Sequence, residues 1–173
     1  MNGEIDVVSN SIITAKINFS LNAHFWDVFD PKVYQVLHSL KQWSEVKLLN
    51  DYGEKNFQMG TLPNDKGGIY IFVAKPDIVP NTHLYLLYIG RARSTRDQNL
   101  RKRCSEYIYE NKRPKIGRMI QQWGKYLYIR YLPLDDNELI DKIEAELINR
   151  ILPPFNDAIP DKEIRAAVQA FSI

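Results

Sequence analysis

Gly68-Ile69-Tyr70 and Tyr88-Ile89-Gly90, with seventeen residues between them, each lie in a short apolar run rich in aromatic and β-branched residues. The runs 68–74 (GIYIFVA) and 83–89 (HLYLLYI) are too short for core helices and suit a pleated surface, so both are predicted strands. The intervening KPDIVPNT contains two prolines, an Asp and an Asn, which cannot continue either strand. The simplest topology is an antiparallel hairpin that places the two tyrosines on neighbouring strands.

Outside this hairpin, the sequence first predicts two helices and a third strand. One helix begins at Asp30-Pro31, with Asp as the N-cap. Its apolar face comprises Val33, Val36, Leu37, Leu40 and Trp43. Residues 44–66 are mostly polar and are expected to be irregular. Pro114 opens another helix, which is expected to end at Gly124. Residues 125–132 (KYLYIRYL) alternate in side-chain character and predict the third strand.

The last long helix is predicted from about Asp136 to Leu152, capped by Asp135 or Asp136, and it carries a carboxylate inside its apolar stripe. This carboxylate is Glu144. A charge on a buried face costs several kcal/mol unless it is paired or bound to a metal. Two partners stay open for it: a salt bridge to a basic residue such as Arg103, or a metal ion. Glu146 lies at the flank of the stripe and is expected to tolerate replacement by Gln.

The composition is that of an ordinary globular chain. With 173 residues, 45% hydrophobic and 25% charged, one domain with a terminal extension is expected. The single cysteine, Cys104, rules out an internal disulfide framework and a multi-cysteine zinc site. Residues 1–10 have neither a basic nor an apolar region typical of a signal peptide, and the longest apolar runs are strand-sized. We therefore expect a cytoplasmic protein without a membrane span.

The charge is unevenly distributed along the chain. The net charge is only +2, yet the segment 84–130 contains twelve Lys or Arg against three acidic residues, a local balance of +9 that leaves −7 for the remainder. A basic stretch with interleaved tyrosines is typical of phosphate-backbone binding. The alternative is a solvated helix face with no partner.

A helix is predicted over residues 99–107, after the second tripeptide. Leu100, Arg103, Cys104 and Tyr107 fall at the spacing of one helix face, so the arginine shares a face with apolar residues. One interpretation is an arginine that packs its stem on the core and extends its head to solvent. The other is a functional guanidinium.

In this order, the residues resemble the GIY-YIG nuclease family, which cuts phosphodiester bonds in nucleic acid and is named for the two tripeptides. The resemblance covers residues 67–157. The family's Leu, followed by Arg three residues on and by Tyr or His four further, matches Leu100, Arg103 and Tyr107. Its helical Glu ahead of a Leu-Ile pair matches Glu144, and its Pro-x-aromatic-Asn ending matches 153–156.

The resemblance implies a role for each matched residue. Tyr70 or Tyr88 would be the general base for the attacking water, and Tyr107 would orient the phosphate or that water. Arg103 would bind the scissile phosphate, for which its planar fork is suited. Glu144 would hold one Mg²⁺ or Mn²⁺ ion together with phosphate oxygens and waters.

Supporting residues follow from the same resemblance and from the basic segment. Arg91 would supply a fixed positive charge, and Asn156 would give hydrogen-bonding support, unless it is only part of a helix-terminating turn. The residues expected to contact the nucleic-acid backbone are Arg93, Arg96, Arg101, Lys102, Lys112, Arg113, Lys115 and Arg118.

The sequence departs from the family pattern in two places. The gap between the tripeptides is longer than usual, which indicates an extended hairpin loop. Arg91 stands where bacterial excision-repair relatives have Lys, and an arginine cannot take up a proton at working pH. A phenol with a pKa of about 10 must be shifted down by two or three units to act as a base near neutrality. Arg91, Arg103 and the metal are the available causes.

These observations predict an α+β domain over residues 67–173, with a small three-stranded antiparallel sheet flanked by helices. Residues 1–66 would be a helical or irregular N-terminal extension, either a specificity element or a dimerisation surface, so a homodimer stays open. The expected activity is metal-dependent endonuclease cleavage of DNA, with RNA left open. The alternatives are a catalytically inactive nucleic-acid-binding module of the same fold, and an interaction protein whose basic segment is simply solvated.

Overall fold

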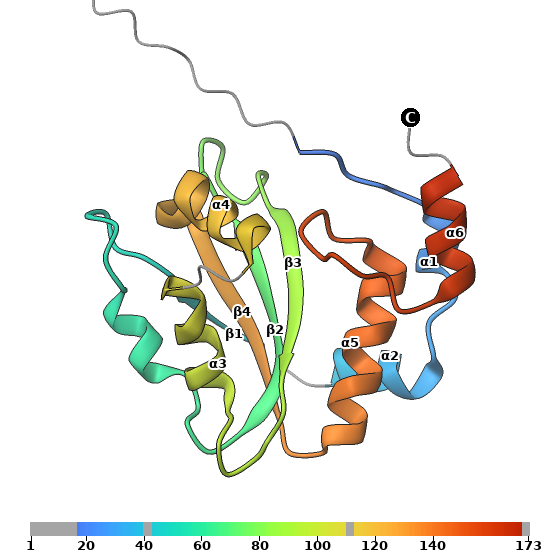
Figure 1. Cartoon of the computed structure of the whole chain (residues 1–173), viewed down its shortest axis with the longest axis horizontal. Coiled ribbons are helices and arrows are strands. Elements are labelled where there is room, and N and C mark those ends of the chain that lie inside the picture. The colour runs from blue at the N-terminus through green and yellow to red at the C-terminus, as the bar shows by residue number, and fades with distance from the viewer. Residues whose placement is uncertain (1–16, 40–42, 110–112, 171–173) are drawn as a thin grey trace, which may run out of the picture.

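The computed structural model describes residues 17–39, 43–109 and 113–170 (Figure 1). Within these ranges the fold is α+β, with a four-stranded antiparallel sheet in the order β1-β4-β2-β3. The strands are β1 (Ser44–Lys47), β2 (Gly67–Ala74), β3 (Tyr85–Ala92) and β4 (Leu127–Leu134).

The three-stranded sheet expected from the sequence is therefore wrong by one strand. The extra strand, β1, pairs with β4 on the far side of β2, in the segment expected to be irregular. It spans four residues, SEVK, and two of them are charged. Neither an apolar run nor a clear alternation marks so short an edge strand. Charges on the exposed edge are themselves a common feature of strands that end a sheet.

The hairpin predicted around the two tripeptides is present as β2 and β3. Tyr70 pairs with Gly90, and Phe72 pairs with Tyr88. The register then shifts so that Val73 faces Leu86, which leaves Leu87 as an extra residue in β3. Because cross-strand partners share a face, Tyr88 lies on the same side of the sheet as Tyr70.

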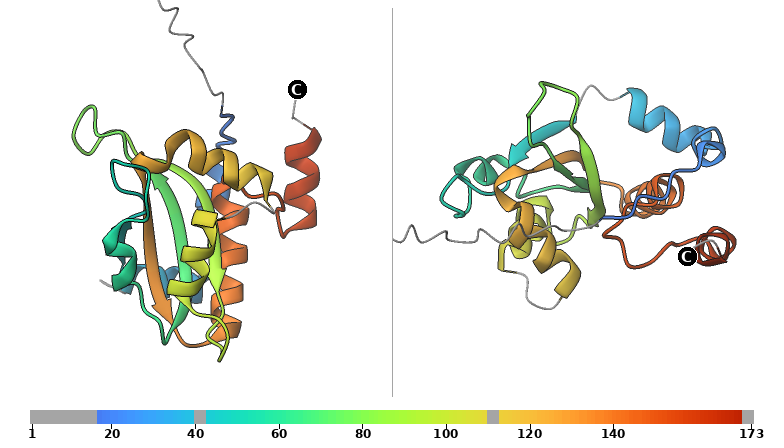
Figure 2. Two further views of the ribbon diagram at one scale, coloured as in Figure 1. Left: turned by 60° about the vertical axis from the view of Figure 1, so that its left-hand side comes forward. Right: turned by 90° about the horizontal axis from the view of Figure 1, so that it is seen from above.

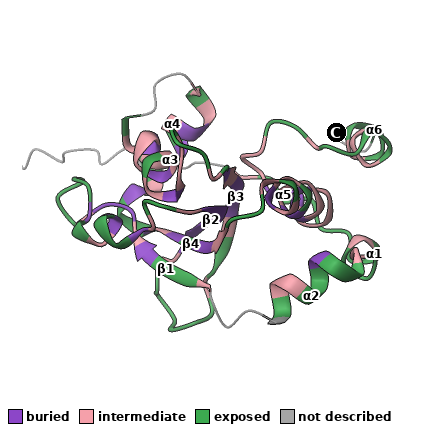
Figure 3. Ribbon diagram, turned by 90° about the horizontal axis from the view of Figure 1, so that it is seen from below, coloured by how far each residue is buried: buried purple, intermediate pink, exposed green. Residues whose placement is uncertain are grey.

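Helices cover both faces of the sheet (Figure 2). The α-helices are α1 (Ala23–Trp26), α2 (Pro31–Ser39), α3 (Leu100–Glu106), α4 (Pro114–Trp123), α5 (Asn137–Ile151) and α6 (Lys162–Ala170). Short 3₁₀ turns are η1 (Phe57–Thr61), η2 (Tyr107–Tyr109) and η3 (Gly124–Tyr126). On one face, α3 and α4 pack with Tyr70 and Phe72 in one core; on the other, α5 and α2 pack on Ile69 and Ile71. Figure 3 shows how burial is concentrated in the strands and the inner side of α5.

The predicted helix starts are confirmed by their caps. Asp30 Oδ1 accepts from the backbone N–H of Val33 at 3.1 Å, and Asp136 Oδ1 accepts from that of Leu139 at 3.1 Å. Asn99 caps α3 through the N–H of Lys102 at 2.9 Å.

One predicted helix end differs from the structure, and another is confirmed. The helix that begins after Asp30 ends at Ser39, so Trp43 lies outside it, and Leu40 falls outside the described residues. The helix opened by Pro114 ends at Trp123 with Gly124 as its C-cap, as expected, and Gly124 keeps a right-handed backbone that leads into the turn η3. A Cβ on Gly124 would lie 2.6 Å from Leu49 Cδ1, so close packing explains this glycine.

Residues before the expected boundary at 67 share the core of the rest. Val46, Leu48, Met59 and Leu62 are buried in the same cluster as Tyr70. The segment 44–62 thus supports the sheet face that carries the tyrosines. In the described ranges no helix is both long and apolar enough to cross a bilayer.

Candidate functional site

A polar pocket of about 630 Å³ opens at the β3 edge of the sheet, with the tyrosines of one face on one side and Glu144 of α5, which packs on the other face, on the other side. Its lining residues come from β2, β3, α3 and α5, from the loop after β3, and from the residue before α4. The lining residues are Tyr70, Tyr88, Arg91, Arg93, Thr95, Gln98, Arg103, Arg113 and Glu144. The pocket therefore brings together all the residues expected to be catalytic except Tyr107, which lies directly behind the two other tyrosines.

The three tyrosine hydroxyls form one hydrogen-bonded network. The oxygens of Tyr70 and Tyr107 are 2.7 Å apart, and the Tyr107 hydroxyl donates to that of Tyr88 at 3.2 Å. Arg113 Nη1 donates to the Tyr107 oxygen at 3.1 Å. Tyr70 and Tyr107 are fully buried, whereas Tyr88 is half-buried and faces the pocket. Tyr88 is therefore the member of the network that a ligand in the pocket can reach.

Arg103 is tied to this network from α3. Its Nε donates to the Tyr70 hydroxyl at 3.3 Å, and its Nη1 pairs with Glu106 Oε2 at 2.9 Å. The guanidinium lies 5.3 Å from the centre of the Tyr107 ring. Its side chain is 23% exposed and lines the pocket, so the guanidinium is neither a freely solvated charge nor fully enclosed.

The environment of Tyr70 and Tyr88 raises the pKa values of these two hydroxyls. Burial raises the pKa of Tyr70 well above its ordinary value, and the nearby Arg103 opposes this without overcoming it. Burial likewise raises the pKa of Tyr88, with Arg113 as the opposing charge. Both shifts are opposite to the one that we expected a base to need. The arginines of the protein alone do not provide that shift.

Glu144 reaches the pocket from α5 and is paired with Arg91. Its Oε2 forms an ion pair with Arg91 Nη1, and its side chain is 16% exposed. Burial raises the pKa of the Glu144 carboxyl, and the charge of Arg91 partly offsets that rise. The salt-bridge interpretation of Glu144 is thus confirmed, but the partner is Arg91 and not Arg103. Arg91 comes from strand β3, and Arg103 comes from helix α3. Helical spacing within one segment does not reveal which of the two lies next to Glu144.

Asp141 is a charged residue of this site that sequence reasoning missed. It lies one turn before Glu144 on α5 and accepts from Arg91 Nε at 2.8 Å and from Arg93 Nε at 3.2 Å. These cations hold the pKa of the Asp141 carboxyl below its usual value, with the hydrogen bond from Arg93 as the largest cause. The spacing of three residues from Glu144 was the available signal.

Thr95, Gln98 and Glu106 were also missed. Thr95 and Gln98 line the pocket from the loop after β3, and Gln98 Nε2 donates to Glu106 Oε1 at 3.2 Å. Glu106, three residues after Arg103 on α3, could have been found from its spacing.

Asn156 supports the strand that carries Tyr88 and Arg91. Its Oδ1 accepts from the backbone N–H of Ile89 at 2.9 Å, and its Nδ2 donates to the carbonyl of Ile89 at 2.8 Å. The N–H of Phe155 donates to the carbonyl of Leu87 at 3.0 Å. The segment after α5 thus satisfies the exposed edge of β3 beside the candidate site, beyond the helix-terminating turn that was the alternative.

The expected backbone-binding residues are distributed over several places. Lys112 lies outside the described residues. Lys115 pairs with Asp157 at 3.1 Å beside an exposed Arg118 on α4. Arg101 turns away, since its Nε donates to the carbonyl of Leu62 at 2.7 Å. Arg93 and Arg113 line the pocket. Arg96 and Lys102 are exposed and stand in the sequence next to residues that line it.

A divalent cation at this site would have Glu144 as its protein ligand and would depend on the substrate and water for the rest of its coordination. No group of three or more His, Cys, Asp or Glu that could hold a metal is found among the residues that the structure describes. Mg²⁺ commonly binds one or two protein carboxylates and completes its octahedron with phosphate oxygens and waters. Glu144, with Oε2 against Arg91 and Oε1 as its second oxygen, can serve as that single carboxylate.

The comparisons with known proteins add no relative: no protein-family model, curated protein sequence or solved structure matches this chain.

Proposed function

We propose that this chain is a divalent-metal-dependent endonuclease of the GIY-YIG type, which hydrolyses phosphodiester bonds in DNA. One observation carries the proposal. Tyr88, Arg103 and Glu144, which the family resemblance selects from segments far apart in the sequence, line one polar pocket. Residues whose types and spacing matter only to the fold have no reason to converge on a shared opening lined by four arginines.

Arginines are suited to hold the substrate in this pocket. Arg103 is held by Tyr70 and Glu106, so its fork is oriented before a phosphate arrives. Arg93 and Arg113 line the same pocket and add positive charge beside it. The expected result is a phosphate that is bound through its two non-bridging oxygens and neutralised as charge develops in the transition state.

Tyr88 is the better candidate for the general base. Tyr70 has no exposed surface, and its hydroxyl is enclosed by Tyr107 and Arg103. Tyr88 borders the pocket, where a bound water or phosphate can reach its hydroxyl, and that hydroxyl is positioned by a hydrogen bond from Tyr107. As a phenolate, Tyr88 accepts the proton of the attacking water while a new P–O bond forms and the bond to the leaving oxygen breaks. A divalent cation bound at Glu144 would supply positive charge to the leaving oxygen and lower the pKa of nearby groups.

The ion pair between Arg91 and Glu144 favours a second candidate function. A carboxylate already neutralised by arginine is a weaker ligand for a cation, and the pKa of Tyr88 is raised rather than lowered. A nucleic-acid-binding module that keeps the basic pocket without cleaving its ligand would have both features.

Plasmid cleavage separates the two functions. Purified protein is incubated with supercoiled plasmid in Mg²⁺ or Mn²⁺, beside an EDTA control, and duplex binding is measured in EDTA over a range of salt. We expect metal-dependent nicking, together with binding that weakens as salt rises because phosphate contacts release counterions. Binding without nicking in either metal would favour the non-cleaving module. Absence of binding at low salt would rule out both.

A further inference from the structure

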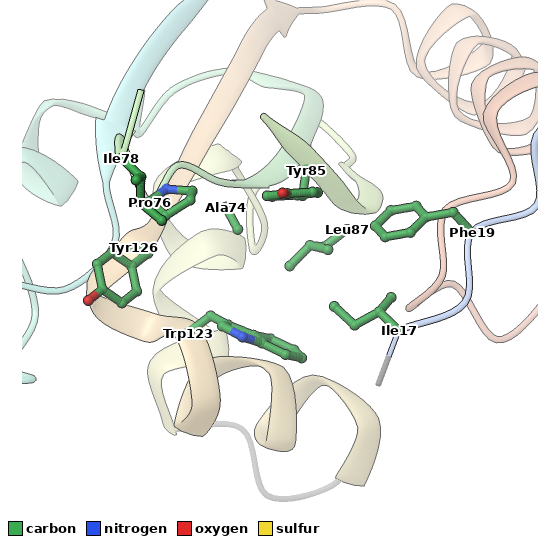
Figure 4. A pocket seen from close by; sticks show the side chains of 9 residues that line it. All are labelled: Ile17, Phe19, Ala74, Pro76, Ile78, Tyr85, Leu87, Trp123 and Tyr126. Atoms are coloured by element: carbon green, nitrogen blue, oxygen red, sulfur yellow. The ribbon is translucent and has the colours of Figure 1, made fainter. Parts of the chain in front are cut away.

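A second pocket, of about 500 Å³, lies on the tyrosine-bearing side of the sheet near the tip of the β2–β3 hairpin. It is lined by Ile17, Phe19, Ala74, Pro76, Ile78, Tyr85, Leu87, Trp123 and Tyr126, and none of these is charged. Trp123 and Tyr85 lie on opposite walls, with Phe19 on one side and Tyr126 on the other (Figure 4). Four aromatic side chains thus surround an opening whose volume is within the range typical of ligand sites.

Two elements connect this pocket to the candidate active site. On β3, Tyr88 lines the polar pocket and Tyr85, three residues away, lines the apolar one, a separation of about 10 Å at the rise of a strand. The segment leading into α4 begins with Arg113 at the polar pocket, and the helix ends with Trp123 at the apolar one, about 15 Å apart at the rise of a helix. Both measures place the two openings side by side along the same face.

The surface between them carries three basic side chains and two acidic ones. A smaller pocket of about 380 Å³ contains Lys115 and Arg118 of α4, and it shares Ile17 and Trp123 with the apolar pocket. A further pocket of about 290 Å³ shares Tyr88, Arg113 and Glu144 with the polar one, and it also contains Asp157, which pairs with Lys115. Arg113 and Arg118 therefore border the path from the candidate active site to the aromatic pocket, while Asp157 offsets the charge of Lys115.

We propose that the apolar pocket receives an unpaired nucleobase of the bound DNA. This inference rests on the proposed function, and it specifies the substrate: a strand with a base that is extruded or unpaired. A base stacks on aromatic rings without needing hydrogen bonds from the pocket, while its phosphate stays outside, beside Arg118. A purely apolar ligand would make no use of the neighbouring cations, so charge favours a nucleotide as the occupant.

The spacing fixes where this base lies. Successive phosphates of one stacked strand are about 3.4 Å apart along the helix axis, so 10 to 15 Å corresponds to roughly three or four nucleotides. The extruded base therefore lies about three or four nucleotides from the scissile phosphate held by Arg103.

The test compares three DNA probes in EDTA at low salt, with affinity read by fluorescence anisotropy. One duplex carries a single unpaired adenine, the second carries an abasic nucleotide at the same bulge, and the third is fully paired. We expect the parent protein to bind the adenine bulge at least about fivefold more tightly than the abasic bulge, because stacking on aromatic side chains is worth that much per base.

Variants locate the preference in the pocket. Tyr126 is 38% exposed, so Tyr126→Ala is expected to fold and to reduce the ratio of the two dissociation constants towards one. Trp123→Ala should act in the same direction, with its melting temperature measured because Trp123 also contacts Phe155. Trp26→Ala, an exposed indole on α1 outside the pocket, is the matched control and should leave the ratio unchanged.

Each result decides between the proposals. Base-dependent binding that Tyr126→Ala removes supports the pocket, whether or not the protein cleaves DNA. A ratio near one in the parent, with the paired duplex bound in EDTA and plasmid nicked in Mg²⁺, overturns the pocket proposal and leaves the nuclease proposal standing. Absence of binding to all three probes overturns both. A ratio lowered equally by Trp26→Ala also overturns the pocket, because the effect would not be local to it.

Discussion

Gly90 lies directly opposite Tyr70 in the ladder between β2 and β3, and a Cβ on Gly90 would lie 2.5 Å from the Tyr70 hydroxyl oxygen. The tyrosine side chain therefore lies across the glycine of the second tripeptide. The glycine of the first, Gly68, has φ +144°, and a Cβ there would overlap the carbonyl oxygen of Leu132. Each tripeptide glycine thus has its own steric cause, and the one at 90 places the hydroxyl that Tyr107 and Arg103 contact.

Gly90→Ala should displace Tyr70 and disturb the hydroxyl network. We expect a loss of about 1–3 kcal/mol in the free energy of unfolding, as for an overpacked core, and a large loss of cleavage. Gly60→Ala is the control, because nothing lies within 4 Å of a Cβ at that exposed position. Urea unfolding and plasmid nicking measure the two effects. An active Gly90→Ala protein of parental stability would show that the Tyr70 ring does not need to lie across residue 90.

The hairpin and the helix caps could be predicted because they depend on local chemistry. A strand-type run ended by prolines, or an Asp ahead of a helical stripe, determines its structure within a few residues. The strand β1 has four residues and gains its stability from pairing with β4, so its own sequence does not mark it. The end of α4 at Gly124 is confirmed, but the close packing of this glycine against Leu49, far away in sequence, was not predictable.

The candidate site was likewise predictable where it depends on local spacing, and not where it depends on the packing of distant segments. Arg103 and Tyr107 were placed together from helical spacing, and the structure brings both to Tyr70. The partner of Glu144 was not predictable, since Arg91 comes from β3 and reaches α5 only through the packing of the helix on the sheet. The burial that raises the pKa of Tyr70 is likewise a property of the assembled core.

Arg103→Ala should separate positioning from chemistry. The variant loses one of many basic groups that attract DNA, but it also loses the guanidinium that Tyr70 and Glu106 hold in place, so cleavage should fall far more than binding. Lys102→Ala removes a neighbouring charge from the same helix. It should weaken binding to a similar degree while bound DNA is still cut. Equal losses of binding and cleavage in Arg103→Ala would mean that this arginine only contacts the DNA backbone and takes no part in cleavage.

Tyr70→Phe should reduce the loss of stability at high pH. Because the folded pKa of Tyr70 is raised, its contribution to stability is fully present below the unfolded pKa of about 10 and is lost as the pH rises above it. Removing the hydroxyl should lessen that decline by up to about 1.4 kcal/mol per pH unit, at a cost of about 1 kcal/mol near neutrality for the lost hydrogen bonds. Tyr52→Phe, at a position 89% exposed, is the control. Denaturant melts from pH 7 to 11 would contradict the argument if the two variants declined alike.

Asn156→Ala should destabilise the edge of β3. It removes the acceptor for the N–H of Ile89 and the donor to its carbonyl, so we expect a loss of about 1–3 kcal/mol. Asn156→Asp keeps the acceptor alone and should fall between the parent and Asn156→Ala. Hydrogen exchange of the Ile89 amide, measured with urea unfolding, tests the local nature of the effect. Unchanged protection of that amide in Asn156→Ala would show that water replaces the side chain fully.

Glu146 is not a suitable control for Glu144, although it was expected to tolerate replacement. Its side chain is 15% exposed, pairs with Arg150 at 3.0 Å and accepts from the N–H of Asp30 at 3.0 Å. It therefore joins the start of α2 to α5, and Glu146→Gln removes a nearly buried charge from its partner. Glu138, exposed in the first turn of α5, is the better comparison.

Glu144→Gln should abolish cleavage while the fold is kept. The variant preserves size but removes the charge that a hard cation requires, and Arg91 keeps Asp141 at 2.8 Å. Because burial raises the pKa of Glu144, ionisation disfavours the folded parent, so the parent should lose stability relative to Glu144→Gln as the pH rises through the acidic range from about 4. Glu138→Gln should match the parent in both assays. Nicking over a Mg²⁺ titration and melts from pH 4 to 8 test this. If Glu144→Gln melts far below the parent at pH 7, the ion pair with Arg91 is needed for stability and is not displaced by a metal. If Glu144→Gln still nicks DNA at ordinary Mg²⁺, Glu144 is not the metal ligand.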